Sequence, residues 1–220
     1  MAGARPVAPG GGPRLAGAMI NHPTPTIIIA GVVGALALAP SAFAGQPARS
    51  DLNPPPPDIY TCQASGEQTI CRASTVEHED PVVTDVDCPG FPIVDQGDEA
   101  SERTRRYDAN GNFVERVERE RWTNAFWSNP LNGNTIPYTQ RGIITDRATV
   151  PGDLDSIVET LVGENIYTDP VTHKNVLTSV GRTVFGLNGL EFSAGQQPFI
   201  ERFVFGDPSA FDALCAALAR

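Results

Sequence analysis

The chain has 220 residues, enough for one domain with tails, and it carries 16 basic against 26 acidic residues. A net charge of −10 argues against nucleic acid or an anionic membrane surface as partner, because both are bound through Lys and Arg. The exception would be a protein that gathers its arginines on one face. The sequence contains neither the GxSxG elbow of α/β hydrolases nor the HExxH motif of zinc proteases.

The first 44 residues have the pattern of an export signal. Arg5 and Arg14 precede an apolar run over 27–39, which is shorter than the roughly 20 residues of a transmembrane helix. Ala42-Phe43-Ala44 then offers the small residues that a signal peptidase accepts. We predict a signal peptide over 1–44 and a secreted, extracellular protein without stable membrane insertion; a buried apolar helix is the alternative. The cleaved chain would keep 14 basic and 26 acidic residues, a net charge of −12.

A proline-rich stretch follows the predicted cleavage site. Four consecutive prolines occupy 54–57, and proline lacks the N–H group that pairs in helices and sheets. We therefore predict a disordered linker over 45–58 and an antiparallel β domain over 59–220.

Four cysteines in an exported chain indicate two disulfides, and three pairings are possible. Cys62 and Cys71 flank a Ser-Gly turn, so a local bond across a hairpin is the economical choice. That choice leaves Cys88 with Cys215, a bond that would hold the last helix against the start of the domain. A zinc site is the competing interpretation, but no CxxC pair is present.

The mature region is dominated by β-branched and aromatic stretches between Gly, Asn and Pro turn signals. This pattern predicts an all-β fold, an antiparallel meander that forms a barrel or a strongly curved sheet. The candidate strands are 60–76, 91–95, 101–107, 113–127, 135–149, 156–168, 176–187 and 190–193.

Asn110-Gly111 is the sharpest hairpin signal, because both residues tolerate the positive φ of a type I′ turn. A two-residue loop there would place Arg106 opposite Glu115 and Arg103 opposite Glu118. The opposite charges support this register, although each exposed pair contributes only some tenths of a kcal/mol.

One short α-helix is predicted at the C-terminal end. Asp207 is a suitable N-cap and Pro208 suits the first helical position. The apolar residues that follow have helical spacing, which points Cys215 inward; they are Phe211, Leu214, Cys215 and Leu218.

Three segments together resemble a family of secreted actinobacterial proteins of unknown function. They are Cys88-Pro89-Gly90-Phe91-Pro92, then Arg106-Tyr107-Asp108 through Gly111-Asn112, and the terminal Phe211 to Leu218 with its Leu-Cys-Ala-Ala-Leu run. The resemblance covers about 88–220 and implies export, an antiparallel β domain and a framework cysteine near each end. It carries over no catalytic residue, and the Cys62–Cys71 segment looks like an addition to the family pattern.

Metal sites have weak candidates. Glu77-His78-Glu79-Asp80 could bind a divalent cation, but a solvated loop is the interpretation that we favour. His173 is expected on the surface. Asp108, Asn110 and Asn112 resemble the first ligands of a calcium loop, but no Glu follows at the twelfth position, so we interpret them as turn residues. We predict no metal and no cofactor.

Acidic and aromatic residues supply the remaining candidates. A glycosidase needs two carboxyl groups about 5 to 10 Å apart, and the sequence offers Glu115, Glu118, Glu120, Glu159 and Glu191 without selecting a pair. An aromatic sugar-stacking face would come from Trp122, Phe126 and Trp127, although core packing is the simpler interpretation. The catalytic residues therefore stay unknown.

From the sequence we expect a secreted, non-catalytic β-barrel-like domain that binds a small apolar ligand or a cell-surface partner. A lipocalin-like barrel could hold such a ligand, but the early Gly-x-Trp signature of lipocalins is missing, so this is an analogy of architecture. The alternative is a secreted glycan hydrolase with paired carboxylates on adjacent strands. Charged side chains inside the sheet would favour the enzyme, because buried charge has to be compensated.

Overall fold

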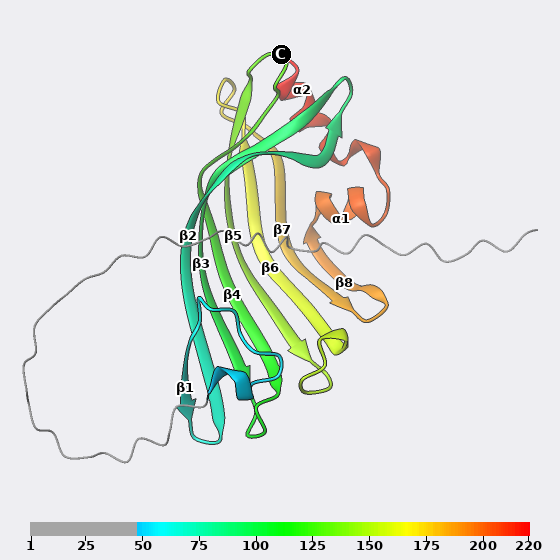
Figure 1. The fold of residues 1–220 in the computed structure, drawn as a ribbon. Helices are drawn as coiled ribbons and strands as arrows, with labels where there is room; N and C mark the ends of the chain where they lie inside the picture. Colours follow the sequence, from blue (N-terminus) through cyan, green and yellow to red (C-terminus); the bar gives the residue numbers. More distant parts are fainter. Residues whose placement is uncertain (1–47) are drawn as a thin grey trace, which may run out of the picture. The chain divides into compact units, whose positions relative to one another are not determined.

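A computed structural model of the chain describes residues 48–220, so the predicted signal peptide lies outside the described residues. These residues form one eight-stranded antiparallel sheet in which each strand pairs with the next along the chain (Figure 1). Two short helices follow the last strand, α1 (Pro198–Phe203) and α2 (Asp212–Leu218). The strands are β1 (Thr61–Ser65), β2 (Gln68–Cys88), β3 (Phe91–Tyr107), β4 (Phe113–Ser128), β5 (Thr135–Ala148), β6 (Ile157–Thr168), β7 (Asn175–Gly186) and β8 (Gly189–Gln196). The predicted all-β meander with a C-terminal helix is confirmed, and it is an open, curved sheet.

β2 and β3 are longer than the sequence predicted. The predicted strand over 60–76 is divided into β1 and β2, and β2 continues beyond it to Cys88. Residues 96–100 join the two stretches that we expected to be separate strands into β3. The residues thus added to β2 and β3 include Gly, Asp and Glu, which have low β propensity. Their pairing with one another, at Glu77 opposite Glu99 and His78 opposite Asp98, supplies the backbone hydrogen bonds that override this preference.

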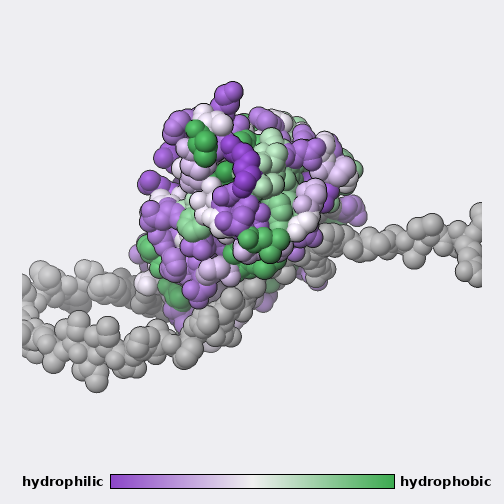
Figure 2. All heavy atoms as spheres, turned by 90° about the horizontal axis from the view of Figure 1, so that it is seen from above, coloured by the Kyte–Doolittle hydropathy of each residue, from purple (hydrophilic) through white to green (hydrophobic). Residues whose placement is uncertain are grey.

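Side chains alternate between two faces of the sheet, and we call the face against which α1 and α2 pack the inner face. At the helical end, buried residues of the strands and helices form one apolar cluster, the helical-end core. Trp127, Tyr138 and Tyr167 lie at its centre, with ring centroids 4.8 Å apart for Trp127–Tyr167 and for Tyr138–Tyr167. Viewed from this end, the surface is mostly hydrophilic, with hydrophobic residues in separate patches (Figure 2).

A second apolar cluster, the N-terminal core, lies at the other end of the same face. It is formed by Leu52, Tyr60, Cys62, Cys71, Tyr107 and Phe113. Leu52 is only 3% exposed and Pro56 is buried, so residues 48–58 are folded against the sheet. The prediction of a disordered linker is therefore wrong over these residues.

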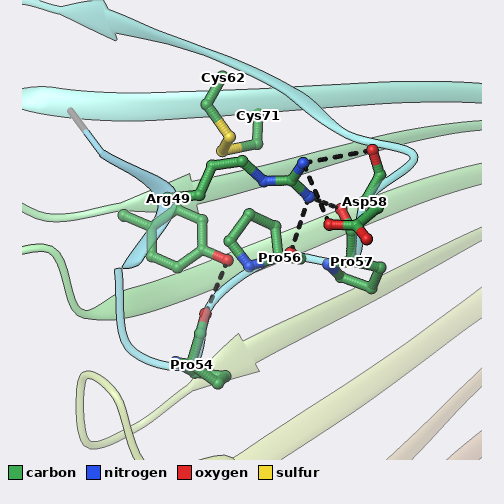
Figure 3. The surroundings of a disulfide bond; sticks show 8 residues. Arg49, Pro54, Pro56, Pro57, Asp58, Cys62 and Cys71 are labelled. Atoms are coloured by element: carbon green, nitrogen blue, oxygen red, sulfur yellow. Dashed lines mark hydrogen bonds and ion pairs between the residues drawn. A yellow bond between two sulfur atoms is a disulfide. The ribbon is translucent and has the colours of Figure 1, made fainter. Parts of the chain in front are cut away.

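The carbonyl groups of the prolines explain why this segment can pack. Proline has no N–H group to satisfy, and its carbonyl oxygen needs a donor when it is buried. The Arg49 guanidinium donates to the carbonyls of Pro56 and Pro57, and the Tyr107 hydroxyl donates to that of Pro54 at 3.0 Å (Figure 3). Sequence periodicity could not reveal these partners, because one lies far along the chain.

The β3–β4 hairpin has the predicted register but a different turn. Arg106 lies opposite Glu115, Arg103 opposite Glu118, and the unfavourable pair of Arg105 and Arg116 is also present. The loop is not a two-residue type I′ turn, because Gly111 has positive φ and Asn110 does not. The Gly111 N–H donates to the Asp108 carbonyl, and an irregularity between Arg106 and Tyr107 restores the predicted pairing.

Both predicted disulfides are present. Cys62 and Cys71 are direct partners in the β1–β2 ladder and belong to the N-terminal core. Cys88 and Cys215 join the end of β2 to α2 in the helical-end core, as the inward position of Cys215 predicted. The Asp207 side chain accepts a hydrogen bond from the Ser209 N–H, so the predicted N-cap is confirmed, although the first turn is a 3-10 helix over Pro208–Phe211.

A row of glycines crosses the last four strands on the inner face. Gly142, Gly163, Gly181 and Gly195 are successive cross-strand partners. Gly181 and Gly195 have φ of 150° and 99°, and a Cβ atom on either would collide with the backbone of the neighbouring strand. Larger residues are therefore excluded at these two positions.

Candidate functional site

A polar band separates the two apolar cores on the inner face. Successive inward positions of β3 in this band are Glu99, Ser101, Arg103 and Arg105, and those of β4 are Arg116, Glu118, Glu120 and Trp122. Several of these side chains are half-buried, and Ser101 and Glu118 are buried. Charged groups are costly to bury without partners, so these side chains need hydrogen bonds or ion pairs within the band.

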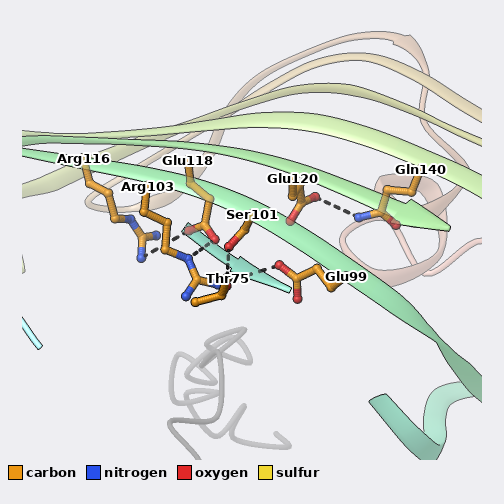
Figure 4. A network of polar contacts seen from close by, with 8 residues as sticks. All are labelled: Thr75, Glu99, Ser101, Arg103, Arg116, Glu118, Glu120 and Gln140. Atoms are coloured by element: carbon orange, nitrogen blue, oxygen red, sulfur yellow. Dashed lines mark hydrogen bonds and ion pairs between the residues drawn. The ribbon is translucent and has the colours of Figure 1, made fainter. Parts of the chain in front are cut away.

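An alternating chain of ion pairs satisfies most of the charge. Arg103 Nε lies 2.5 Å from Glu118 Oε1, and Arg116 Nη1 lies 3.8 Å from Glu118 Oε2 (Figure 4). Arg116 Nε lies 2.7 Å from Asp146 Oδ2 on β5. Glu118, with only 8% of its side chain exposed, thus lies between two guanidinium groups, which compensate its burial.

Two cross-strand rows beside this chain bring together an aromatic ring, two carboxyl groups and an amide. Glu99, Trp122 and Gln140 are successive partners in one row, and Ser101, Glu120 and Gly142 in the next. Gln140 Nε2 donates to Glu120 Oε1 at 2.8 Å (Figure 4). Trp122 is half-buried and packs against the edge of the helical-end core, so its ring forms a border between the apolar and polar parts of the face.

The two carboxyl groups in these rows hold their protons unusually well. Burial raises the pKa of Glu99 to about 7; the negative charge of Glu120 adds to this rise, and Arg103 opposes it. Burial also raises the pKa of Glu120, although the hydrogen bond from Gln140 opposes the shift. Near neutral pH, Glu99 is therefore a carboxyl that can both donate and accept a proton, as a general acid or base requires.

A second carboxyl pair lies at the far end of the band. Asp146 on β5 is the direct partner of Glu159 on β6, and burial is the main cause that raises the pKa of both groups. The charge of Asp146 is a further cause for Glu159, and Arg116 opposes the rise for both. The ion pair between Arg116 and Asp146 connects this carboxyl pair to the rest of the polar band, which thus extends across β3, β4, β5 and β6.

Asp95 is a third acidic group with a raised pKa, and it lies at the edge of the helical-end core. Burial raises its pKa to about 6, although the Tyr138 hydroxyl donates to it at 3.0 Å. Asp95 is also the cross-strand partner of Trp127, so it lies beside two aromatic residues of this core.

Some of the acidic and aromatic residues predicted from the sequence as site candidates lie in the polar band, and others lie elsewhere. Glu118, Glu120 and Glu159 lie in the polar band, whereas Glu115 joins Arg106 and Arg147 on the outer face and Glu191 is exposed on β8. Of the three aromatic candidates, Trp127 is buried in the core, Phe126 alternates to the outer side, and Trp122 alone borders the band.

The acidic cluster around His78 lies in a strand and not in the expected loop. Strand alternation places His78 on the opposite face from Glu77 and Glu79, and the His78 ring contacts Asp98 at 2.7 Å. His173 lies in the exposed β6–β7 loop, and Asp108 accepts hydrogen bonds from the Asn110 and Asn112 N–H groups, as turn residues do. Within residues 48–220, no three His, Cys, Asp or Glu side chains are grouped so that they could hold a metal ion.

The sequence did not single out Glu99 or Gln140, and it indicated Arg103 only as a hairpin partner of Glu118 and not as a member of a wider network. The missing step was the continuity of β3 through residues 96–100, since it places Glu99 on the same face as Ser101 and Arg103. Had residues 91–107 been taken as one strand, alternation alone would have aligned these three side chains.

Comparison with protein-family models, with curated proteins and with solved structures found no match to this chain. The resemblance to secreted actinobacterial proteins therefore stays a prediction. In the part of the chain that the structure describes, no helix combines the length and the apolar character needed to cross a bilayer.

Proposed function

We propose that the protein is a secreted, non-catalytic domain that binds a hydroxyl-rich, carbohydrate-like ligand on the polar band of its inner face. Export is supported by the leader pattern over 1–44 and by the two disulfides, which persist in oxidising compartments.

The ligand class differs from the apolar molecule that the sequence led us to expect. Both apolar stretches of the inner face are already filled by protein: α1 and α2 contribute to one core, and residues 52 and 60 to the other. The stretch between them offers amide, hydroxyl and carboxyl groups.

The observation that carries the proposal is the row of Glu99, Trp122 and Gln140, with Glu120 in the adjoining row. Sugars are held by hydrogen bonds to their hydroxyl groups and by stacking of their C–H faces on aromatic rings. Trp122 supplies the ring, the three polar side chains supply donors and acceptors, and Gly142 adds no side chain next to Glu120.

The test is a screen of soluble oligosaccharides on the secreted chain, followed by calorimetry on any ligand found. Trp122→Ala should weaken binding by roughly ten-fold, because it removes the stacking surface, whereas Trp122→Phe should retain most of it. Glu102→Gln, on the exposed outer face of β3, is the matched control for Glu120→Gln. Binding that survives Trp122→Ala and Glu120→Gln unchanged would exclude the polar band as the site.

Glycoside hydrolysis is the second candidate, and one observation favours it. Glu99, whose pKa is raised to about 7, lies in the row next to Glu120, and an acid that keeps its proton near neutral pH is what a glycosidase needs beside a second carboxyl group. Turnover of any glycan that Glu99→Gln and Glu120→Gln each reduce by roughly a hundred-fold, with Glu102→Gln unaffected, would replace binding with catalysis as the function.

A further inference from the structure

The outer face of the sheet has a hollow that the polar band does not explain. It occupies about 750 Å³ and runs across the strands from β4 to β8, over the line of the glycine row. Its walls are side chains that point away from the two cores, and its floor is the row of Glu120 and the four glycines, whose side-chain positions face inward. The hollow and the candidate site therefore lie on opposite faces of the sheet.

Four arginines line this hollow, and three of them lie at one end. Arg119 and Arg121 come from β4 and Arg141 from β5, while Arg182 comes from β7; all four are exposed. Among the salt bridges within residues 48–220, none involves any of these four. In a chain with a net charge of −10, arginines that form no salt bridge within the described residues are thus gathered on one face, and Arg182 packs its guanidinium over the Phe192 ring.

The pairing of Arg121 with Arg141 is unfavourable for the fold itself. The two are direct cross-strand partners, and like charges in such positions destabilise a sheet. An acidic side chain at either position would relieve the repulsion. Glu164, the partner of Arg141 on its other side, is the acidic residue that lines the hollow from the outer face, and Glu102 lies beyond Arg119. The positive charge therefore exceeds the negative charge at this end.

The other half of the hollow is mainly aliphatic, and the two charged residues in it, Glu164 and Arg182, have opposite signs. Val162 and Val180 on β6 and β7 are 46% and 43% exposed, Ile143 on β5 is 40% exposed, and Ala194 borders the end on β8. Ile143 is the direct partner of both Arg119 and Val162, so the apolar surface begins where the arginine group ends. Five strands at about 4.8 Å spacing give a length of about 19 Å, which suits a head group on β4 and β5 together with a dodecyl-length alkyl chain.

We infer that this hollow binds a monomeric, single-chain anionic amphiphile, such as a fatty acid or an alkyl phosphate. The head group lies among Arg119, Arg121 and Arg141, where guanidinium groups donate charge-assisted hydrogen bonds to carboxylate or phosphate oxygens. The alkyl chain lies along Val162 and Val180. A linear polyanion fits less well, because between Arg141 and Arg182 the hollow presents Val162, Val180 and the acidic Glu164.

Dodecanoate and dodecyl phosphate, used below their micelle concentrations, are the probes, with binding measured by calorimetry on the folded, disulfide-bonded protein. Both should bind, and dodecanol and dodecyltrimethylammonium should bind at least roughly ten-fold more weakly, because they lack the negative head group. Acetate and inorganic phosphate should also bind weakly, because they lack the chain.

The variants locate the site. Arg121→Gln with Arg141→Gln should reduce the affinity for dodecanoate by roughly ten-fold or more, and Val162→Thr by a smaller factor. Arg72→Gln removes one positive charge, half of the change in the double variant, from the outer face of β2, outside the hollow, and should leave the affinity unchanged. The double variant should be at least as stable as the parent protein, because it removes a like-charge pair.

Several results would overturn the inference: no binding of either anionic probe, equal binding of dodecanol, or an equal loss with Arg72→Gln. Binding to anionic phospholipid vesicles without binding of the monomers would assign the arginines to a membrane surface. Tight binding of a sulfated polysaccharide, lost with the double variant, would assign them to a polyanion. None of these outcomes changes the proposal for the inner face, which Trp122→Ala tests separately.

Discussion

The two disulfides should differ about two-fold in their contribution to stability, because they close loops of very different length. Cys88 and Cys215 are 127 residues apart, whereas Cys62 and Cys71 are 9 apart. A cross-link stabilises chiefly by removing conformational entropy from the unfolded chain, and that entropy grows with the logarithm of the loop length.

The loop-closure relation gives about 5 kcal/mol for the long loop and about 2.6 kcal/mol for the short one. All four cysteines are at most 8% exposed, so the loss of packing on replacement by alanine is similar for both pairs. The difference between the two variants, about 2.4 kcal/mol, is therefore more reliable than either value alone.

The assay is urea denaturation of the parent protein, of Cys88→Ala/Cys215→Ala and of Cys62→Ala/Cys71→Ala, followed by fluorescence of the two tryptophans. Each variant keeps the other disulfide, so no free thiol complicates the comparison. Equal losses of unfolding free energy, or a larger loss for the short loop, would refute the entropic argument. They would show that local packing governs the effect of each bond.

Three further predictions concern other parts of the domain. Burial raises the pKa of Glu99 to about 7 from an ordinary 4.5. Its contribution to stability is therefore complete below about pH 4.5 and is lost as the pH rises to about 7. Melting temperatures between pH 4 and 8 should fall less steeply for Glu99→Gln than for the control Glu102→Gln. Gly181→Ala should lower the free energy of unfolding by about 2 to 3 kcal/mol, because the added Cβ atom meets backbone. Gly133→Ala, at a site with positive φ but open space, should lower it by about 1 kcal/mol, and similar losses for the two variants would contradict the role of the glycine row. Leu52→Ala should lower the free energy of unfolding by about 2 to 4 kcal/mol, whereas Ile59→Ala, at a site 52% exposed, should lower it by less than about 1 kcal/mol. Chemical denaturation distinguishes the two, and a negligible effect at Leu52 would mean that the N-terminal segment does not stabilise the sheet.

Local signals in the sequence were sufficient for the meander and for the last helix. Alternation between turn signals defined most strands, and the apolar spacing from Phe211 to Leu218 predicted which side of α2 is buried. The register of the β3–β4 hairpin was also predicted, although through the wrong turn type. Charge pairing along the strands, Arg103 with Glu118 among them, carried that information independently of the turn.

Features that depend on distant partners were not predictable in this way. The proline segment packs because Tyr107 and Arg49 satisfy its carbonyl groups, and α1 has only six residues, too few for a helical period to be recognised. The candidate site belongs to the same class. Glu118, Glu120 and Glu159 were among the candidates but Glu99 was not, because its place beside them depends on its alignment with Trp122 across two strands.

Each end of the inner face has its own apolar cluster and its own disulfide, and the polar band between them contributes little hydrophobic cohesion. Amide hydrogen exchange should therefore divide the molecule into two protected regions that open separately, with different opening free energies, although the same strands run through both. The polar band is then the boundary at which one end of the sheet can unfold locally while the other end keeps its native contacts.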